Sequence, residues 1–131
     1  MQPAKLEQIE AAIVDSSIKV HRELGPGLLE NAYEFCLSRE LRKRSFFVEC
    51  QKSLPITYDG ATLDIGYRLD LIVEGSVIIE AKAVEQLLPV HRAQIITYLK
   101  LSGCTLGYLI NFNMPLLKDG LKRIVLEHPH P

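Results

Sequence analysis

Two charged residues, Glu80 and Lys82, stand near the end of the apolar run VIIEAKA at residues 77–83. A run of Val and Ile is typical of a buried strand, and a buried charge needs either a partner or a chemical task. The preceding run, YRLDLIV at residues 67–73, carries Asp70 in a similar setting. Because carboxylate oxygens are the ligands that Mg²⁺ prefers, two acids brought together by these runs would form a metal site.

The pairing of these two strands decides whether the acids meet. A two-residue turn between the strands would place the charged sets on opposite faces of the sheet. A three-residue loop at residues 74–76 instead pairs Val73 with Val77 and sets Asp70 opposite Glu80, and this is the register that we expect. Like charges directly opposite are destabilising, which favours a cation site over a hairpin selected for stability alone. The alternative is a solvated hairpin face with weak ion pairs.

The composition indicates one domain of an ordinary cytoplasmic protein. The chain has 131 residues, of which 47% are apolar and 24% charged, and we expect a single domain over residues 1–131. No apolar run approaches the ~20 residues that span a bilayer, and the N-terminus lacks a basic-then-apolar signal pattern. We therefore expect a cytoplasmic location without membrane contact. The net charge of −1 gives no overall attraction to nucleic acid, so local patches or a bound cation would have to supply it.

The hydrophobic period changes along the chain from helical to strand-like and back. Gly and Pro at residues 25–27 end one helix, and turn signals at Asp59-Gly60 and Glu74-Gly75 separate strands. We expect helices at residues 4–24, 28–44 and 89–102, and strands at residues 46–51, 54–60, 61–73, 77–83, 105–112 and 121–127. This order predicts an α/β or α+β fold in which helices pack against a central mixed sheet.

The helix at residues 89–102 carries a polar stripe. His91, Gln94 and Tyr98 lie about one helical turn apart along it. Taken alone, the stripe is explained as a polar edge beside the apolar positions of the helix.

The helix at residues 28–44 carries an acid near its start and cations near its end. Glu30 and Tyr33 share a face, and an acid in the first turn complements the helix dipole. Arg42, Lys43 and Arg44 complement the dipole at the other end, and contacts to nucleic-acid phosphates are the alternative role for them.

Together these residues resemble a known set. Asp70, then Glu80-Ala81-Lys82, then Gln94 and Tyr98, with Glu30 upstream, resemble the PD-(D/E)XK nuclease superfamily. The segment VHRELGPGLLENAYE resembles a small family named for a GxxExxY signature, here Gly27, Glu30 and Tyr33, and this resemblance spans about residues 10–126. Leu69 stands where the superfamily name has proline, and Ala81 replaces a larger apolar residue. Neither change removes a group that does chemistry.

The resemblance implies a restriction-endonuclease-like αβββαβ core and a Mg²⁺-dependent (or Mn²⁺-dependent) attack of water on a phosphodiester. It implies metal ligation by Asp70, Glu80, the backbone carbonyl of Ala81, and Glu30 directly or through water. It implies that Lys82 assists the nucleophile, and that Gln94 and Tyr98 orient the substrate backbone or hold Lys82. His21, His91 and Tyr33 lie in motif-like stretches and would border the same cleft. A satisfied structural role is the alternative for both histidines.

Three functions remain open at this level. The leading hypothesis is a metal-dependent nuclease that acts on nucleic acid, with DNA favoured over RNA. The second is a non-cleaving module that binds nucleic acid or protein with the same fold, and the third is a hydrolase of another phosphorylated substrate. The sequence leaves open whether the chain forms a homodimer.

Overall fold

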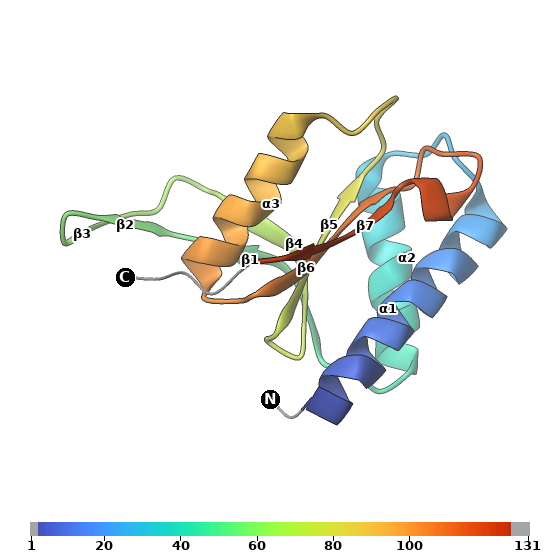
Figure 1. Ribbon diagram of the computed structural model, residues 1–131, viewed down its shortest axis with the longest axis horizontal. Helices are drawn as coiled ribbons and strands as arrows, with labels where there is room; N and C mark the ends of the chain where they lie inside the picture. Colours follow the sequence, from blue (N-terminus) through green and yellow to red (C-terminus); the bar gives the residue numbers. More distant parts are fainter. Residues whose placement is uncertain (1–2, 127–131) are drawn as a thin grey trace.

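Helices and strands alternate along the chain nearly as the sequence predicts. The structure is a computed structural model that describes residues 3–126 (Figure 1). Its elements are α1 (Pro3–Leu24), α2 (Glu30–Lys43), β1 (Val48–Ser53), β2 (Ile56–Tyr58), β3 (Ala61–Leu63), β4 (Arg68–Val73), β5 (Val77–Lys82), α3 (Pro89–Ser102), β6 (Leu106–Asn111), the short 3-10 helix η1 (Leu117–Asp119) and β7 (Leu121–Val125). The last predicted strand was expected to reach Glu127, which lies outside the described residues. Within residues 3–126, no helix has the length and apolar character that a membrane span requires.

The five-stranded sheet has the order β1-β4-β5-β6-β7. β5 and β6 run parallel, and the other neighbours in the sheet are antiparallel. The order α2, β1, β4, β5, α3, β6 along the chain confirms the predicted αβββαβ core with a mixed central sheet.

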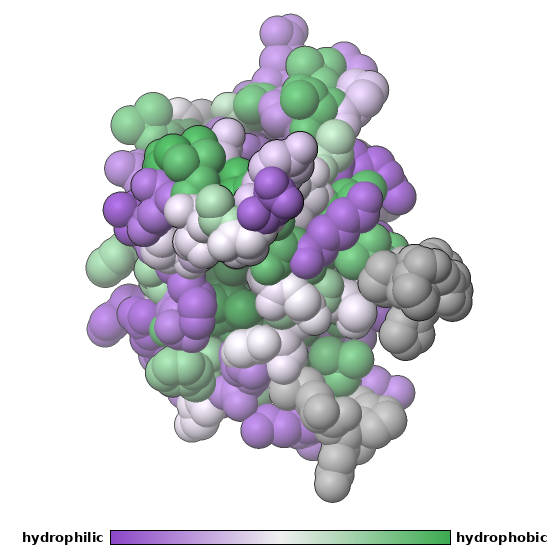
Figure 2. All heavy atoms as spheres, turned by 90° about the vertical axis from the view of Figure 1, so that its left-hand side faces the viewer, coloured by the Kyte–Doolittle hydropathy of each residue, from purple (hydrophilic) through white to green (hydrophobic). Residues whose placement is uncertain are grey.

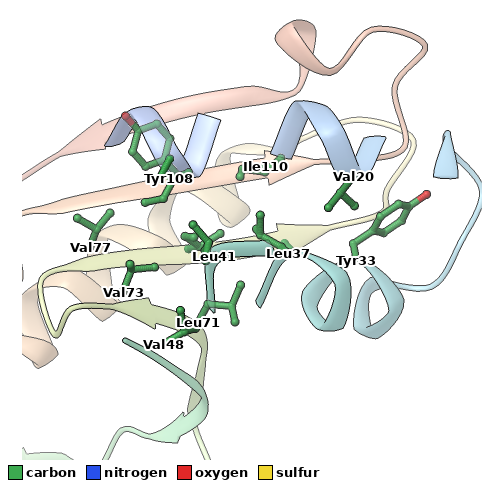
Figure 3. Packing of buried hydrophobic residues seen from close by; sticks show 14 of the residues in the cluster. Val20, Tyr33, Leu37, Leu41, Val48, Leu71, Val73, Val77, Tyr108 and Ile110 are labelled. Atoms are coloured by element: carbon green, nitrogen blue, oxygen red, sulfur yellow. The ribbon is translucent and has the colours of Figure 1, made fainter. Parts of the chain in front are cut away.

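Apolar side chains cover both faces of this sheet. One cluster joins α1 and α2 to the sheet, where Val20 and Leu37 are buried together with Val77 of β5 (Figure 3). A second cluster lies under α3 and includes Ile78 and Ile95. Because the central strands are covered on both sides, β5 and β6 read as nearly continuous apolar runs, as parallel strands usually do.

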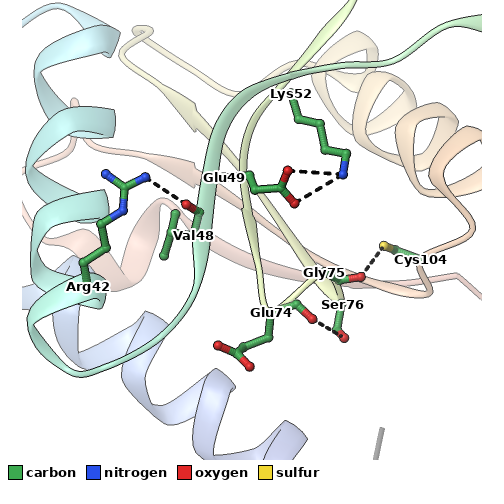
Figure 4. A network of polar contacts seen from close by, with 8 residues as sticks. All are labelled: Arg42, Val48, Glu49, Lys52, Glu74, Gly75, Ser76 and Cys104. Atoms are coloured by element: carbon green, nitrogen blue, oxygen red, sulfur yellow. Dashed lines mark hydrogen bonds and ion pairs between the residues drawn. The ribbon is translucent and has the colours of Figure 1, made fainter.

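The loop between β4 and β5 has the predicted three-residue form. Val73 pairs with Val77, and the Ser76 amide donates to the Val73 carbonyl at 3.0 Å. Glu74 and Gly75 both have positive φ, at 54° and 62°. Figure 4 shows this loop from close by. The two-residue alternative is therefore wrong, and this register sets Asp70 opposite Glu80, just beyond the last paired residues Leu71 and Ile79.

One predicted strand divides in two. Residues 61–73 were expected as a single strand, but β3 ends at Leu63 and β4 begins at Arg68, because the chain turns at Gly66 with φ of +90°. β2 and β3 then form a separate hairpin that projects from the main sheet (Figure 1). Its tip is the predicted Asp59-Gly60 turn, where both residues have positive φ, as a tight hairpin requires.

Candidate active site

The sheet opens between β4 and β5 at the two acids. The paired residues end at Leu71 and Ile79, just before Asp70 and Glu80. There the backbone amides donate to side-chain carboxylates instead of to carbonyls of the neighbouring strand. The Asp70 amide donates to Glu80 Oε2 at 3.0 Å, and the Ala81 amide donates to Asp70 Oδ2 at 2.9 Å. The reciprocal bonds hold the two side chains against each other inside the sheet, as the predicted register requires.

Burial makes both carboxyl groups reluctant to ionise. Glu80 is 3% exposed, and its pKa is raised to about 8, first by burial and then by the negative charge of Asp70. Burial is also the main cause that raises the pKa of Asp70, although its hydrogen bond from the Ala81 amide acts in the opposite direction. The positive charge of Lys82 favours ionisation of both groups. The effect of this charge on the two pKa values is smaller than the effect of burial.

Lys82 lies at the end of β5 and is held from α3. Its Nζ donates to Gln94 Oε1 at 3.0 Å, and Gln94 Nε2 donates to Tyr98 Oη at 3.1 Å. Of the two implied roles for Gln94, the structure contains the contact that holds Lys82. None of the ion pairs within residues 3–126 includes this lysine, so its ammonium is positioned by a neutral amide. His91 lines one cleft together with Lys82, Gln94 and Tyr98, and its Nδ1 accepts from the Leu88 amide at 2.9 Å.

The first turn of α2 contacts the chain just after the end of β5. Glu30 is the first residue of the helix, and its Oε2 accepts from the Ala83 amide at 3.2 Å. The negative charge of Glu30 is one of the causes that raise the pKa of Asp70, which places the two acids in one electrostatic group.

Two residues that the sequence analysis did not single out belong to this group. Glu34 lies one turn after Glu30, and its pKa is raised by burial and by the charge of Asp70. Gln51 of β1 donates from Nε2 to Glu34 Oε1 at 2.6 Å. The i, i+4 spacing to Glu30 was a usable signal for Glu34. No sequence signal pointed to Gln51, because its role follows from a strained backbone with φ of +52° that interrupts the pairing of β1 with β4 opposite Asp70.

The predicted phosphate-binding cations lie at the other end of α2 and have internal partners. Arg42 donates to the Val48 carbonyl at 2.8 Å (Figure 4). Lys43 pairs with Glu40 at 3.6 Å, and Arg44 is 4.0 Å from Asp15. Since 12 residues separate Glu30 from Arg42, the helix rise of 1.5 Å per residue puts them about 18 Å apart along the axis. The structure thus does not bring these cations to the carboxylates.

Two of the remaining predicted residues hold the chain together. Tyr33 is fully buried, and its hydroxyl donates to the Gly25 carbonyl at 2.6 Å and accepts from the Leu28 amide at 3.1 Å. Its ring stacks on Phe112 with 4.5 Å between centroids. His21 is also buried, and its Nε2 contacts the Met114 carbonyl at 2.7 Å. Tyr33 thus holds the loop between α1 and α2, and His21 holds the segment after β6. For His21 this is the satisfied structural role that was the alternative in the sequence analysis.

A divalent cation fits this group through two acids rather than three. Within residues 3–126, no cluster of three or more His, Cys, Asp or Glu side chains has the spacing to hold a metal ion. Asp70 and Glu80 each use one carboxylate oxygen on a backbone amide and carry a second oxygen as a ligand atom. Mg²⁺ is often bound by only one or two carboxylates together with water and substrate phosphates. The donor chemistry of Asp70 and Glu80 therefore suits Mg²⁺ or Mn²⁺.

The comparison with protein families covers almost the whole described chain. Residues 7–124 match the family model for the PD-(D/E)XK nuclease superfamily, a segment that runs from α1 to β7. Comparisons with curated proteins and with solved structures gave no match. The matched segment contains the opening between β4 and β5 and every side chain that borders it. The chain belongs to the PD-(D/E)XK nuclease superfamily.

Proposed function

We propose that this protein is a divalent-metal-dependent nuclease that hydrolyses phosphodiester bonds of nucleic acid, with DNA as its substrate. The observation that carries the proposal is the reciprocal pair Asp70 and Glu80 in the opening of the sheet, beside an ammonium group held in place. Membership of the nuclease superfamily supports the same reaction class.

Burying the Asp70 and Glu80 carboxyl groups together lowers the stability of the fold unless a cation binds between them. Burial raises the pKa of both groups, and the negative charge of Asp70 raises the pKa of Glu80 further, to about 8, so the metal-free pair retains a proton near neutral pH. A hairpin that served only stability would favour apolar residues at these positions. Asp70 and Glu80 would hold the ion, with the Ala81 carbonyl as a third oxygen. When bound, a divalent ion supplies Lewis-acid polarisation of the scissile phosphate and lowers the pKa of water.

Lys82 has the position of a group that stabilises developing negative charge. Its ammonium lies beside the acids, at the wall of an open cleft, and Gln94 fixes its direction. A preorganised cation aimed at the attacked phosphate lowers the barrier without reorganising during the reaction. Tyr98 supports Gln94 through its hydroxyl and acts one step further from the substrate.

The test is a cleavage assay with single-stranded and duplex oligonucleotides in Mg²⁺, in Mn²⁺ and in EDTA. We expect cleavage that requires the metal and that falls by roughly 100-fold or more in Asp70→Asn, because a metal ligand contributes several kcal/mol. Asp64→Asn is the matched control, since Asp64 is an exposed acid of the loop between β3 and β4. Wild-type rates in Asp70→Asn, or full activity in EDTA, would refute the proposal.

A non-cleaving binding module is the second candidate. The net charge of −1 favours it, because the chain as a whole has no attraction that would bring a nucleic-acid substrate to the site, and Arg42, Lys43 and Arg44 have internal partners. This candidate predicts that Asp70→Asn still binds nucleic acid, and that neither the wild type nor Asp70→Asn cuts any strand.

A further inference from the structure

A cleft of about 570 Å³ lies beside the acids, between α3 and the base of the β2–β3 hairpin. Lys82, Gln94 and Tyr98 form the wall nearest the carboxylates, so the cleft is continuous with the candidate active site. The hairpin contributes Ile56, and the link from β3 to β4 contributes Tyr67. This volume falls within the roughly 300–1,000 Å³ that is typical of ligand pockets.

The charge of this region disfavours the backbone of a duplex. Lys82 is the only lysine, arginine or acid among the ten residues that line the cleft. The nearby acids Glu30, Glu34, Asp70 and Glu80 repel phosphates, and duplex binding depends on many cation–phosphate contacts. The cleft must therefore anchor its ligand mainly by means other than charge, with one phosphate reaching the ammonium and the metal.

The walls offer such an anchor. Tyr67 is 43% exposed, and the exposed apolar side chains Val90 and Leu101 of α3 line the same cleft. Figure 2, which looks at the molecule from the side of the hairpin, shows apolar surface between polar groups on this face. An exposed aromatic ring with apolar neighbours suits the flat face of a nucleobase, and stacking of this kind is tolerant of sequence.

We infer that the cleft binds an unpaired nucleobase stacked on Tyr67, next to the phosphodiester that reaches Lys82, so that the protein acts on single-stranded nucleic acid in preference to duplex. The inference rests on the proposed function and names its substrate class. A paired base inside a duplex has no free face for Tyr67, and it would first have to leave the stack.

The test measures binding separately from cutting. The background protein for all variants is the otherwise unsubstituted chain, so that Asp70 and Glu80 can still hold a cation. Ca²⁺ replaces Mg²⁺ in the binding buffer so that strands stay intact, because Ca²⁺ takes the same oxygen ligands in a looser geometry. Fluorescence anisotropy then follows a short labelled oligodeoxythymidine and a blunt duplex of equal length. We expect tighter binding of the single strand and a loss of about 5- to 150-fold in Tyr67→Ala, as stacking measurements on other proteins imply. Tyr67→Phe retains the ring and should bind nearly as well as the background protein.

Tyr58→Ala is the matched control, because Tyr58 is 81% exposed on the β2–β3 hairpin, next to the link that carries Tyr67, and does not line the cleft. Equal binding of duplex and single strand, or equal losses in Tyr58→Ala and Tyr67→Ala, overturns the inference. If the wild type cuts duplex in Mg²⁺ and Tyr67→Ala changes neither binding nor rate, the proposed function stands and the inference fails. If Tyr67 carries single-strand binding but the wild type cuts nothing, the cleft assignment stands and the nuclease fails.

Discussion

Replacing Glu80 with glutamine should make the metal-free protein more stable at high pH and leave it unchanged at low pH. In the folded chain the Glu80 carboxyl has a pKa of about 8, against an ordinary glutamate pKa of 4.5. Below pH 4.5 the group is protonated in both states and costs nothing. Between pH 4.5 and 8 only the unfolded chain ionises, so the free energy of unfolding falls as pH rises. Above pH 8 both states are ionised, and the loss stays constant.

The magnitude follows from the same two values. The difference between about 8 and 4.5 is about 3.5 pH units, and at about 1.4 kcal/mol for each this gives roughly 5 kcal/mol. That figure is a ceiling, because entry of water and small shifts of the strands reduce the cost of a buried charge. It is still large beside the roughly 5–15 kcal/mol by which whole domains are stable. The glutamine oxygen also retains an acceptor for the Asp70 amide.

Urea unfolding in EDTA at several pH values between 5 and 9 measures this effect. The stability gain of Glu80→Gln over the wild type should be less than about 1 kcal/mol at pH 5 and grow to several kcal/mol by pH 9, up to the same ceiling. Glu85→Gln is the control, since Glu85 is exposed in the loop after β5. A gain that does not change with pH would show that Glu80 is already ionised in the folded metal-free protein, and the electrostatic reasoning would be refuted.

Three further changes test the parts around the acids. Gln94→Leu removes the partner of Lys82 and should lower the maximal cleavage rate by about tenfold or more while substrate binding changes little; an unchanged rate would contradict a positioning role. Tyr33→Phe leaves two backbone groups of the loop before α2 without a partner, so urea unfolding should show a loss of about 1–3 kcal/mol with metal binding retained; equal stability would mean that water replaces the hydroxyl. Gly107→Ala places a Cβ 3.0 Å from Ile95 Cδ1, and a loss of about 1–3 kcal/mol is expected by the same method unless α3 shifts freely.

The fold and the central pair could be predicted because local patterns determine them. Period-two alternation and the three-residue loop at residues 74–76 fix the register in which Asp70 meets Glu80, and a slip by one residue would expose a whole apolar face. Gln94 and Tyr98 also contact each other within four residues of one helix, but the polar stripe alone was explained as a polar edge, and only the family resemblance marked them as site residues. The register signal is short in sequence, so no knowledge of tertiary packing was needed for it.

The rest of the site depends on how distant elements meet. Gln51 joins the group only because β1 is distorted opposite Asp70, and nothing in a single strand predicts a residue with φ of +52°. The division of residues 61–73, which creates the hairpin and its cleft, depends on one glycine, Gly66. The cations at the end of α2 looked available in sequence, but Arg42 donates to Val48 of β1 and Arg44 lies beside Asp15 of α1. Only Lys43 has its partner, Glu40, within its own helix.

In the proposed function, this opening in the sheet sets the order in which ligands bind. The negative charges of Glu30, Glu34 and Asp70 act on neighbouring acids of the group, and the positive charge of Lys82 opposes them. An anionic strand that arrives without a cation meets repulsion, which burial strengthens because the local dielectric is low. A divalent ion changes the sign of the field there, so affinity for nucleic acid should rise with Mg²⁺ even in conditions where nothing is cut. In the proposed function, cation binding at Asp70 and Glu80 is therefore expected to be a condition for substrate binding, while the buried Glu80 lowers the stability of the metal-free fold at neutral and high pH.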